Sequence, residues 1–231
     1  MKLPKILLED NLIGKCIDWC TYEIYNIFID TKEEGKLLVT IKEMRCVYHL
    51  THLDNLDSII KNGLLSRDEM IRRGWKFRDV ADKRMLQSRE KYELEKYVPF
   101  HFFPLNPFDE RVQKENPGCD MIYLALQRSY AEALNYKIIP RHPMNGYMLE
   151  IYDYTEGYKR IEWDVMEKRD YYDHECKQIC MAECLTDKLV NFNSFVSINV
   201  KDERTKTIVT KELIKNHISM HINVTPWFFI K

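Results

Sequence analysis

The sequence predicts an α+β protein in which short apolar strands are separated by amphipathic helices. Three stretches carry this prediction: β-branched and aromatic residues from 47 to 51, an aromatic run from 97 to 103, and an apolar run from 121 to 126. Apolar residues recur at helical spacing between and after them. The chain has neither a Gly-x-Gly-x-x-Gly sequence nor a Gly-Lys-Ser/Thr loop, which disfavours a Rossmann or P-loop fold.

Length and composition favour an ordinary intracellular protein. The 231 residues suit one large domain, or a domain with a small appendage, and 45% of them are hydrophobic. The net charge of −1 excludes a global basic field, so any nucleic acid must bind to a local patch. Seven cysteines without a secreted pattern indicate a reducing compartment. The apolar run at the N-terminus is too short for a signal peptide, and no membrane span is expected. We therefore expect a cytoplasmic protein.

The stretch from 47 to 63 changes from a strand pattern to a helix pattern. Apolar residues at helical spacing begin at Leu53, Asp54 or Asn55 can cap the helix, and Gly63 is placed to end it. Polar residues therefore gather at the end of the predicted strand, where side chains often face a ligand. These residues are His49, Thr51 and His52. A single histidine there is more often structural, but this density of polar groups is more specific.

The remaining elements follow from periodicity and turn residues. Residues 1–46 are expected to form an accessory layer, with a helical apolar stripe from Ile13 to Phe28 and a strand over 37–41. Further along, the patterns predict a loop at 104–109, helices at 129–134 and 211–216, a strand or short helix at 147–152, and strands at 195–200, 219–224 and 225–229. Tyr97 and His101 are spaced to share one strand face, which can line a cleft.

The segment from Arg72 to Lys96 is the most basic part of the chain. It holds nine basic residues against five acidic ones, an excess of four. Aromatic residues able to stack on bases are interleaved with them, including Trp75, Tyr92 and Tyr97. This pattern fits a nucleic-acid contact surface, and it equally fits a solvated helix laced with charge pairs.

Glu183 stands in an otherwise apolar run, where a carboxylate costs desolvation unless a partner or a chemical role awaits it. Cys176, Cys180 and Cys184 recur every four residues around it and would share one face of a continuous helix. No fourth ligand at a usual spacing completes a zinc site, so packing by small apolar thiols is the better interpretation.

Several motifs resemble those of DarT-type DNA ADP-ribosyltransferase toxins. The opening motif is Tyr-His-Leu-Thr-His-Leu-Asp-Asn-Leu at 48–56, followed by Asp-Val-Ala-Asp-Lys-Arg at 79–84. Tyr-Val-Pro-Phe-His-Phe at 97–102 is similar to the family's Tyr-Val-Pro-Phe-Tyr-Phe, with His101 in place of a tyrosine. Lys-Gln-Ile-Cys-Met-Ala-Glu at 177–183 resembles the run that ends at the catalytic glutamate. The likeness extends over about 47–231 in the family's order and leaves 1–46 as an N-terminal accessory region.

The resemblance implies the ADP-ribosyltransferase fold, with two packed, mostly antiparallel sheets around an NAD cleft and flanking helices. It implies transfer of ADP-ribose from NAD, used as co-substrate without a metal, to a guanine or thymine in single-stranded DNA. It also implies a toxin paired with a DarG-type macrodomain antitoxin, acting as a monomer away from membranes. The family usually continues its aromatic strand with Pro-Arg-Ser-Pro-Met, whereas this chain has Pro-Leu-Asn-Pro-Phe at 104–108, which leaves the target base open.

The resemblance also implies roles for individual residues. Glu183 is expected to stabilise positive charge at the ribose carbon and to take a proton from the attacking base, with Arg84, or secondly Arg89, as the catalytic arginine. The other expected contacts fall into two sets. Those to NAD are His49, Thr51, His52, Asn55, Tyr97 and His142, and those to DNA are Arg78, Arg89, Trp75 and Tyr92. RNA or protein as the acceptor, and a nucleic-acid-binding module without chemistry, remain alternatives.

Overall fold

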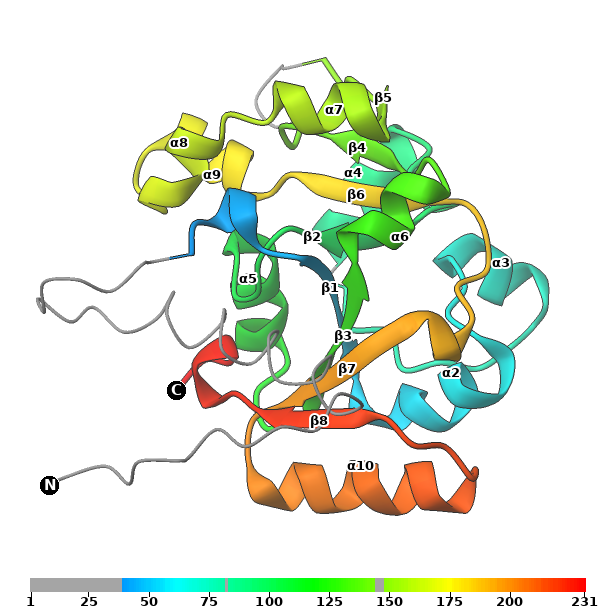
Figure 1. The fold of residues 1–231 in the computed structure, drawn as a ribbon. Coiled ribbons are helices and arrows are strands. Elements are labelled where there is room, and N and C mark those ends of the chain that lie inside the picture. The colour runs from blue at the N-terminus through cyan, green and yellow to red at the C-terminus, as the bar shows by residue number, and fades with distance from the viewer. Residues whose placement is uncertain (1–38, 82, 144–147) are drawn as a thin grey trace, which may run out of the picture.

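The computed structural model describes residues 39–81, 83–143 and 148–231, and it contains an eight-stranded sheet flanked by helices (Figure 1). The strands lie in the order β5-β4-β6-β2-β1-β3-β7-β8, and each pairs antiparallel with its neighbour except β7 and β8, which are parallel. The strand bounds are β1 Cys46–His52, β2 Val98–His101, β3 Met121–Gln127, β4 Lys137–Ile139, β5 Tyr152–Asp153, β6 Glu183–Thr186, β7 Phe195–Val200 and β8 His221–Val224.

The helices cover the faces and ends of this sheet. Their bounds are α2 Leu56–Asn62, α3 Arg67–Arg72, α4 Lys83–Lys91, α5 Pro107–Glu115, α6 Arg128–Ala133, α7 Tyr154–Arg160, α8 Trp163–Lys168, α9 His174–Cys180 and α10 Glu203–Lys215. Short 3₁₀ turns lie at Ile41–Glu43, Leu53–Asn55, Phe192–Ser194 and Pro226–Phe228. Within the described ranges, no helix is long and apolar enough to cross a membrane.

The sheet consists of two halves that meet at one residue pair. On one side of β1, all seven residues pair with β3. On the other side, the described residues of β1 and β2 pair only where Tyr48 lies opposite His101. The predicted two-sheet arrangement is therefore one continuous sheet with a narrow joint, and the halves diverge on either side of it.

The apolar core follows the central strands. Ile122, Leu124 and Leu126 of β3 are fully buried, which agrees with the apolar run seen in the sequence. A cluster of rings packs against β1 and β3, where Tyr48 lies 5.8 Å from Phe228, edge to face, and Tyr123 lies 5.7 Å from the same ring. The 3₁₀ turn at Pro226–Phe228 thus packs against the centre of the sheet.

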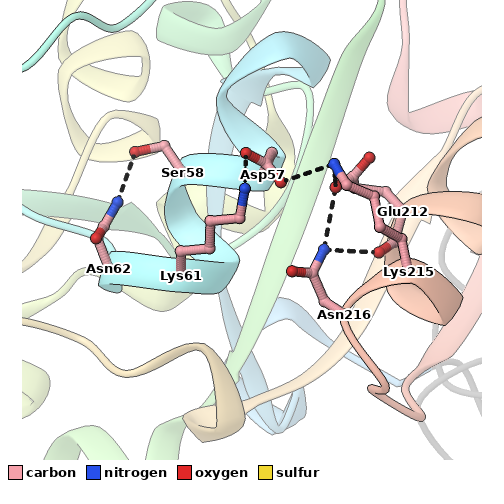
Figure 2. Close-up of polar contacts among 7 residues, drawn as sticks. All are labelled: Asp57, Ser58, Lys61, Asn62, Glu212, Lys215 and Asn216. Carbon is pink, nitrogen blue, oxygen red and sulfur yellow. Dashed lines mark hydrogen bonds and ion pairs between the residues drawn. The ribbon is translucent and has the colours of Figure 1, made fainter.

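The helix that leaves β1 ends as predicted. Gly63 has φ +78°, a region that residues with a Cβ rarely adopt, and a Cβ there would lie 2.9 Å from the Val190 carbonyl oxygen. The predicted cap differs: Asn55 makes no side-chain cap bond to α2, whereas the His52 ring accepts from the Asp54 N–H and caps the preceding 3₁₀ turn. At the surface, Asp57 of α2 accepts from Lys61 and from Lys215 of α10 (Figure 2).

Several predicted elements were wrong. The described part of the predicted strand at 37–41 leads into a 3₁₀ turn, because Thr40 and Glu43 form a capping box. The expected loop at 104–109 contains the start of α5, where the Asn106 side chain accepts from two backbone N–H groups and Pro107 takes the first helical position. The expected strand at 225–229 contains a 3₁₀ turn.

Two helix predictions also need correction. The helix predicted at 211–216 begins at Glu203, where Asp202 caps it. The continuous helix through three cysteines does not exist, because α9 ends at Cys180 and Cys184 lies in β6, paired with β2 and β4. Among the described residues, no group of histidine, cysteine or acidic side chains is arranged to hold a metal. The apolar stripe predicted from Ile13 to Phe28 lies outside the described residues, and the domain division at 46/47 stays a prediction.

Candidate active site

A pocket opens where β1 and β2 separate. Beyond the Tyr48–His101 pair, the backbone of β2 carries Pro99, which has no N–H to offer β1. The side chain of His49 crosses the gap instead, with Nδ1 2.8 Å from the Pro99 carbonyl oxygen. Because a carbonyl only accepts, Nδ1 carries the proton and Nε2 is left as an acceptor. Burial lowers the pKa of His49 to about 4, so this ring is neutral at pH 7.

The pocket encloses about 170 Å³ and draws its walls from several elements. The lining residues that the sequence singled out come from β1, the following helix and the basic segment: His49, Thr51, Asn55, Arg78 and Arg89. Another part of the lining comes from β2 and α5 and includes Val98, His101, Phe108 and Asp109. The separation of two strands thus creates a hollow lined by both polar and aromatic side chains.

One wall of the pocket is an irregular segment, Phe77 to Ala81, that is anchored at three points. Asn55 bonds both the N–H and the carbonyl of Arg78, at 2.7 and 3.0 Å. Arg67 donates to Asp79 at 2.9 Å, and Asn116 donates to the Val80 carbonyl at 3.0 Å. Asn55 also donates to the Thr51 hydroxyl, so β1 and this segment are held to one another through a single amide.

A buried ion pair lies beside the pocket. Glu183, at the start of β6, is 0% exposed, and Nη1 of Arg89 donates to both of its carboxylate oxygens at 3.0 and 2.8 Å. Nη2 of the same guanidinium donates to the Leu94 carbonyl, which fixes its position. Burial would raise the pKa of Glu183, but the charge and hydrogen bonds of Arg89, together with His101 and His142, hold the pKa below its ordinary value, so the carboxylate is ionised at pH 7.

Two buried histidines flank this pair. His101 lies directly across from Glu183 in the register of β2 and β6, and His142 also interacts electrostatically with that carboxylate. Burial lowers the pKa of both rings, that of His101 to about 4. Within the described residues, Nε2 of His101 and Nδ1 of His142 have no hydrogen-bond partner. The carboxylate therefore has one cation and two neutral rings around it.

Four further predicted site residues do not line this pocket or have side chains outside the described part of the chain. Arg84 belongs to α4, but its side chain lies outside the described part of the chain. Tyr97 precedes β2 and lines a separate surface hollow beside Lys188, so it does not share the cleft with His101. Tyr92 packs on a small apolar cluster with Leu94, and Trp75 lies under the Arg73 guanidinium at 4.9 Å. Their predicted contacts with NAD and DNA stay predictions.

Sequence reasoning missed some wall residues. Arg67 reaches the pocket from α3, and Phe108 and Asp109 reach it from α5, an element that was interpreted as a loop. The available signal was the Asn-Pro pair at 106–107, which is a helix N-cap followed by proline at the first helical position. Reading that start correctly would have placed Asp109 in the first turn of a helix beside the aromatic strand.

Solved structures share this architecture. The DarT of Thermus sp. 2.9 in complex with ADP-ribosylated single-stranded DNA superposes with a TM-score of 0.69 at 20% identity, covering 80% of this chain and 96% of that one. The same protein in complex with NAD+ gives a TM-score of 0.66 at 18% identity, covering 80% and 98%. These similarities show that the chain has the ADP-ribosyltransferase fold.

Sequence comparison is more specific. A family model described as single-stranded DNA thymidine ADP-ribosyltransferase, DarT, matches residues 48–230, so the chain belongs to the DarT family. A DNA ADP-ribosyl transferase–DNA ADP-ribosyl glycohydrolase fusion protein from Thermosipho africanus is 26% identical over 196 residues, which are 80% of this chain and 49% of the relative. The chain thus spans about half the length of that curated relative. The family resemblance seen in the sequence is confirmed.

Proposed function

We propose that this protein transfers ADP-ribose from NAD to a base in single-stranded DNA. The observation that carries the proposal is the ionised Glu183, fully buried and held by Arg89, which itself lines the pocket between β1 and β2. A buried carboxylate kept charged by one guanidinium is costly for the fold, and such groups are concentrated at sites of chemistry. Membership of the DarT family supports the same activity, and its description names thymidine as the target.

The residues around the pocket suit a reaction in which a ribose carbon becomes positively charged. NAD, when bound, supplies the ADP-ribosyl group with nicotinamide as the leaving group. The Glu183 carboxylate places negative charge where positive charge develops, as a carboxylate does in glycoside hydrolysis. The same carboxylate is the proposed acceptor for the proton of the attacking base nitrogen. Arg89 holds Glu183 ionised and offers a fixed cation to anionic groups of the substrates.

The pocket has features that fit a dinucleotide with an aromatic head. His49 and Thr51 present polar groups from β1, and the guanidiniums of Arg67, Arg78 and Arg89 also lie along the lining, each paired with a carboxylate. The rings of His101 and Phe108 also line the pocket and lie 5.1 Å apart. Relatives solved with NAD+ and with ADP-ribosylated single-stranded DNA support these two substrates for this chain.

The curated relative also bears on the partner of this protein. The Thermosipho relative is a fusion of a transferase with a glycohydrolase, which supports a partner able to remove the mark, of the DarG macrodomain type. We propose that this chain acts in the cytoplasm, as a monomer with respect to itself. Size-exclusion chromatography of the purified protein, alone and with such a partner, tests both statements about assembly.

The decisive experiment incubates the protein with NAD and short single-stranded oligonucleotides, each containing one kind of reactive base. We expect the mass to rise by one ADP-ribosyl group on the thymine oligonucleotide. Modification of the guanine oligonucleotide instead would move the target to the alternative base. Modification of RNA or protein pools but of no DNA would replace the proposed acceptor, and NAD turnover absent with every acceptor would favour a binding module without chemistry.

The basic segment predicts that DNA binding depends on salt. Arg73, Arg78 and Trp75 lie on the stretch that leads into the pocket wall, where the strand can be held by phosphate contacts and stacking. We expect the affinity for a single-stranded oligonucleotide to fall about ten-fold or more between 50 and 200 mM salt. An affinity unchanged over that range would show that the segment does not contact phosphates.

A further inference from the structure

His101 lines the pocket and has a buried hydrogen-bond acceptor. Its Nδ1 lies 3.3 Å from the Ala182 carbonyl oxygen, and since a carbonyl only accepts, the ring proton is on Nδ1. Its Nε2 is then a bare acceptor, and within the described residues it has no partner although the side chain is only 3% exposed. A buried acceptor without a donor is costly to the fold, so a ligand donor at this point is favoured.

Asp109 presents the complementary group. Its Oδ2 accepts from Asn106 at 2.7 Å and from the Tyr123 hydroxyl at 3.1 Å. Its Oδ1 has no partner among the described residues, and the side chain is 1% exposed. Burial raises the pKa of Asp109 to about 8, although the surrounding groups of Tyr123, the Leu105 backbone and Asn106 lower it. At neutral pH the carboxyl is therefore mainly protonated, and because Oδ2 already accepts two bonds, the proton belongs on Oδ1.

These two groups line the same pocket and have opposite polarity. His101 comes from β2 and Asp109 from α5, and Phe108 also lines the pocket, with its ring 5.1 Å from that of His101. One acceptor, one donor and an aromatic wall match a planar ring that carries a carbonyl beside an N–H. Neither group takes part in the ion pair of Glu183 and Arg89 described above.

We propose that His101 and Asp109 form a recognition site for an amide group, in which His101 Nε2 accepts from the ligand N–H and Asp109 Oδ1–H donates to the ligand carbonyl. Two substrate groups carry this chemistry: the carboxamide of nicotinamide and the ring amide of guanine. The single ring N–H of thymine is on the nitrogen that Glu183 is proposed to deprotonate, so this site would not hold it. Adenine and cytosine lack a ring N–H next to a carbonyl. The proposal rests on the proposed function for the choice of ligands, but its test does not require DNA modification.

Two substitutions of His101 separate recognition from a structural role. In His101→Gln the side-chain amide reaches the position of Nε2 and keeps an acceptor in the pocket, but it gives up the bond to Ala182. In His101→Asn the amide reaches only the position of Nδ1, so it keeps the bond to Ala182 and removes the acceptor. We expect His101→Asn to lose about ten-fold in kcat/KM, and His101→Gln to stay within about three-fold of the wild type. The reverse order would overturn the proposal in favour of a structural role.

Asp109 has its own matched pair. Asp109→Asn keeps an acceptor for Asn106 and Tyr123 and places an N–H donor where the acid proton is, so we expect near wild-type activity. Asp109→Ala removes the donor, and we expect a loss of about ten-fold in kcat/KM. Full activity of Asp109→Ala, or loss in Asp109→Asn with an unchanged melting temperature, would contradict the donor role. If Asp109→Ala does not fold, the Asp109→Asn result and the His101 pair still decide between recognition and a structural role.

The source of the amide is identified by comparing two reactions. NAD hydrolysis without DNA is measured with NAD and with 3-acetylpyridine adenine dinucleotide, which has the carbonyl but no amide N–H. If the site holds nicotinamide, the wild type prefers NAD and His101→Asn loses that preference. If it holds the base, hydrolysis is unaffected and only transfer to the oligonucleotide falls. Absence of any DNA modification by the wild type would refute the proposed acceptor, while the hydrolysis measurements would still test the nicotinamide arm. Unchanged hydrolysis and transfer in every variant would refute the amide site itself.

Discussion

Strand β1 forms a full set of backbone pairs along one edge and, among the described residues, a single pair along the other. Along β3 the strand is paired at every residue from Cys46 to His52, and no side chain is needed between the backbones. Along β2 it is paired only at Tyr48, and side chains take over where the backbone bonds stop. His49 bonds to Pro99 across this gap, and the pocket opens there. The pocket therefore forms where β1 lacks a paired neighbour on one edge, while pairing with β3 along the other edge keeps β1 in the sheet.

The same contrast separates the two halves of the sheet by chemistry. The half containing β3 and β7 buries apolar residues at its centre, such as Leu124 and Ile198. The half containing β2 and β6 buries His101 and Glu183 in register with one another. Burial of ionisable groups costs free energy that an apolar core would not, and here that cost is concentrated at the open edge. The predictions below test this division.

The largest effect is expected for Glu183→Gln. The substitution keeps the shape of the side chain and removes the negative charge, so the developing positive charge at the ribose carbon loses its counter-charge. We expect transfer of ADP-ribose to fall by about 100-fold to 1,000-fold, a loss typical of removing one electrostatic stabiliser. Initial rates with labelled NAD and a thymine oligonucleotide measure it.

A matched control is Glu175→Gln, in α9. Glu175 is exposed and pairs with Arg141 at 3.0 Å, so its charge has no part in the pocket. We expect its transfer rate to stay within about two-fold of the wild type. Equal activity of Glu183→Gln and Glu175→Gln would remove Glu183 from the chemistry.

The second effect is on stability. Arg89→Ala leaves Glu183 buried without its cation, and breaking a buried pair from one side costs about 3–5 kcal/mol. Because the Glu183 pKa lies below its ordinary value of 4.5 in the folded state, this contribution is present above pH 4.5 and is lost as the pH falls through the folded-state pKa. Urea denaturation at pH 7 and at a series of lower pH values measures both statements.

Arg72→Ala serves as the comparison, because Arg72 is an exposed residue of α3 that pairs with Glu69. We expect it to change the unfolding free energy far less than Arg89→Ala does, because exposed ion pairs contribute little. If Arg89→Ala were no more destabilising than Arg72→Ala, the Arg89–Glu183 pair would not be desolvated as the structure has it.

A smaller effect is expected where the pocket wall is anchored. Asn55→Ala removes the two bonds to the backbone of Arg78 and the bond to Thr51, so the segment from 77 to 81 is held less firmly over the pocket. We expect the KM for NAD to rise about three-fold to ten-fold, with a smaller change in kcat. Steady-state kinetics measure this split.

Asn62→Ala is the matched variant, at the end of the helix that follows Asn55. Asn62 donates to Ser58 at 3.3 Å on the surface (Figure 2). Its KM should equal that of the wild type. A fall in kcat of Asn55→Ala with KM unchanged would mean that the amide acts on the reaction rather than on binding.

The smallest effect is expected on the closed side of β1. Asp57 of α2 accepts from Lys61 and from Lys215 of α10, which itself bonds Glu212, and all of these groups are at the surface (Figure 2). Exposed pairs contribute little, so we expect Asp57→Asn to shift the melting temperature by about 2 °C or less, and by still less at high salt. A shift larger than that of Arg89→Ala would reverse the division between the two edges.

Local patterns predicted much of the fold but little of how the site is assembled. The apolar run of β3, the strand at 195–200 and the glycine at 63 were found because each is determined by its own residues. The continuous cysteine helix failed because pairing of β6 with two neighbouring strands overrides helical spacing at Cys184. Pairing between strands that are distant in the sequence cannot be predicted from the residues of one segment alone.

The candidate site shows the same limit. The isolated carboxylate at 183 was found because burying a charge is unusual in an apolar run, and the sequence offered Arg89 only as a second choice for the catalytic arginine. The two residues are separated by 94 positions and meet only in the folded chain, where Arg89 of α4 reaches the first residue of β6. Asp109 was missed because its helix was interpreted as a loop, although its cap was visible at Asn106.

The backbone at Ile230 reaches the pocket through a relay of hydrogen bonds. The Ile230 N–H donates to Gln113, whose amide donates to the Tyr123 hydroxyl, which in turn donates to Asp109. The position of the acid in the pocket wall therefore depends on residues that the ribosome adds long after the acid itself. Loss of the Ile230 N–H bond would release Gln113 and the Tyr123 hydroxyl, and the acid in the pocket wall would be held less firmly.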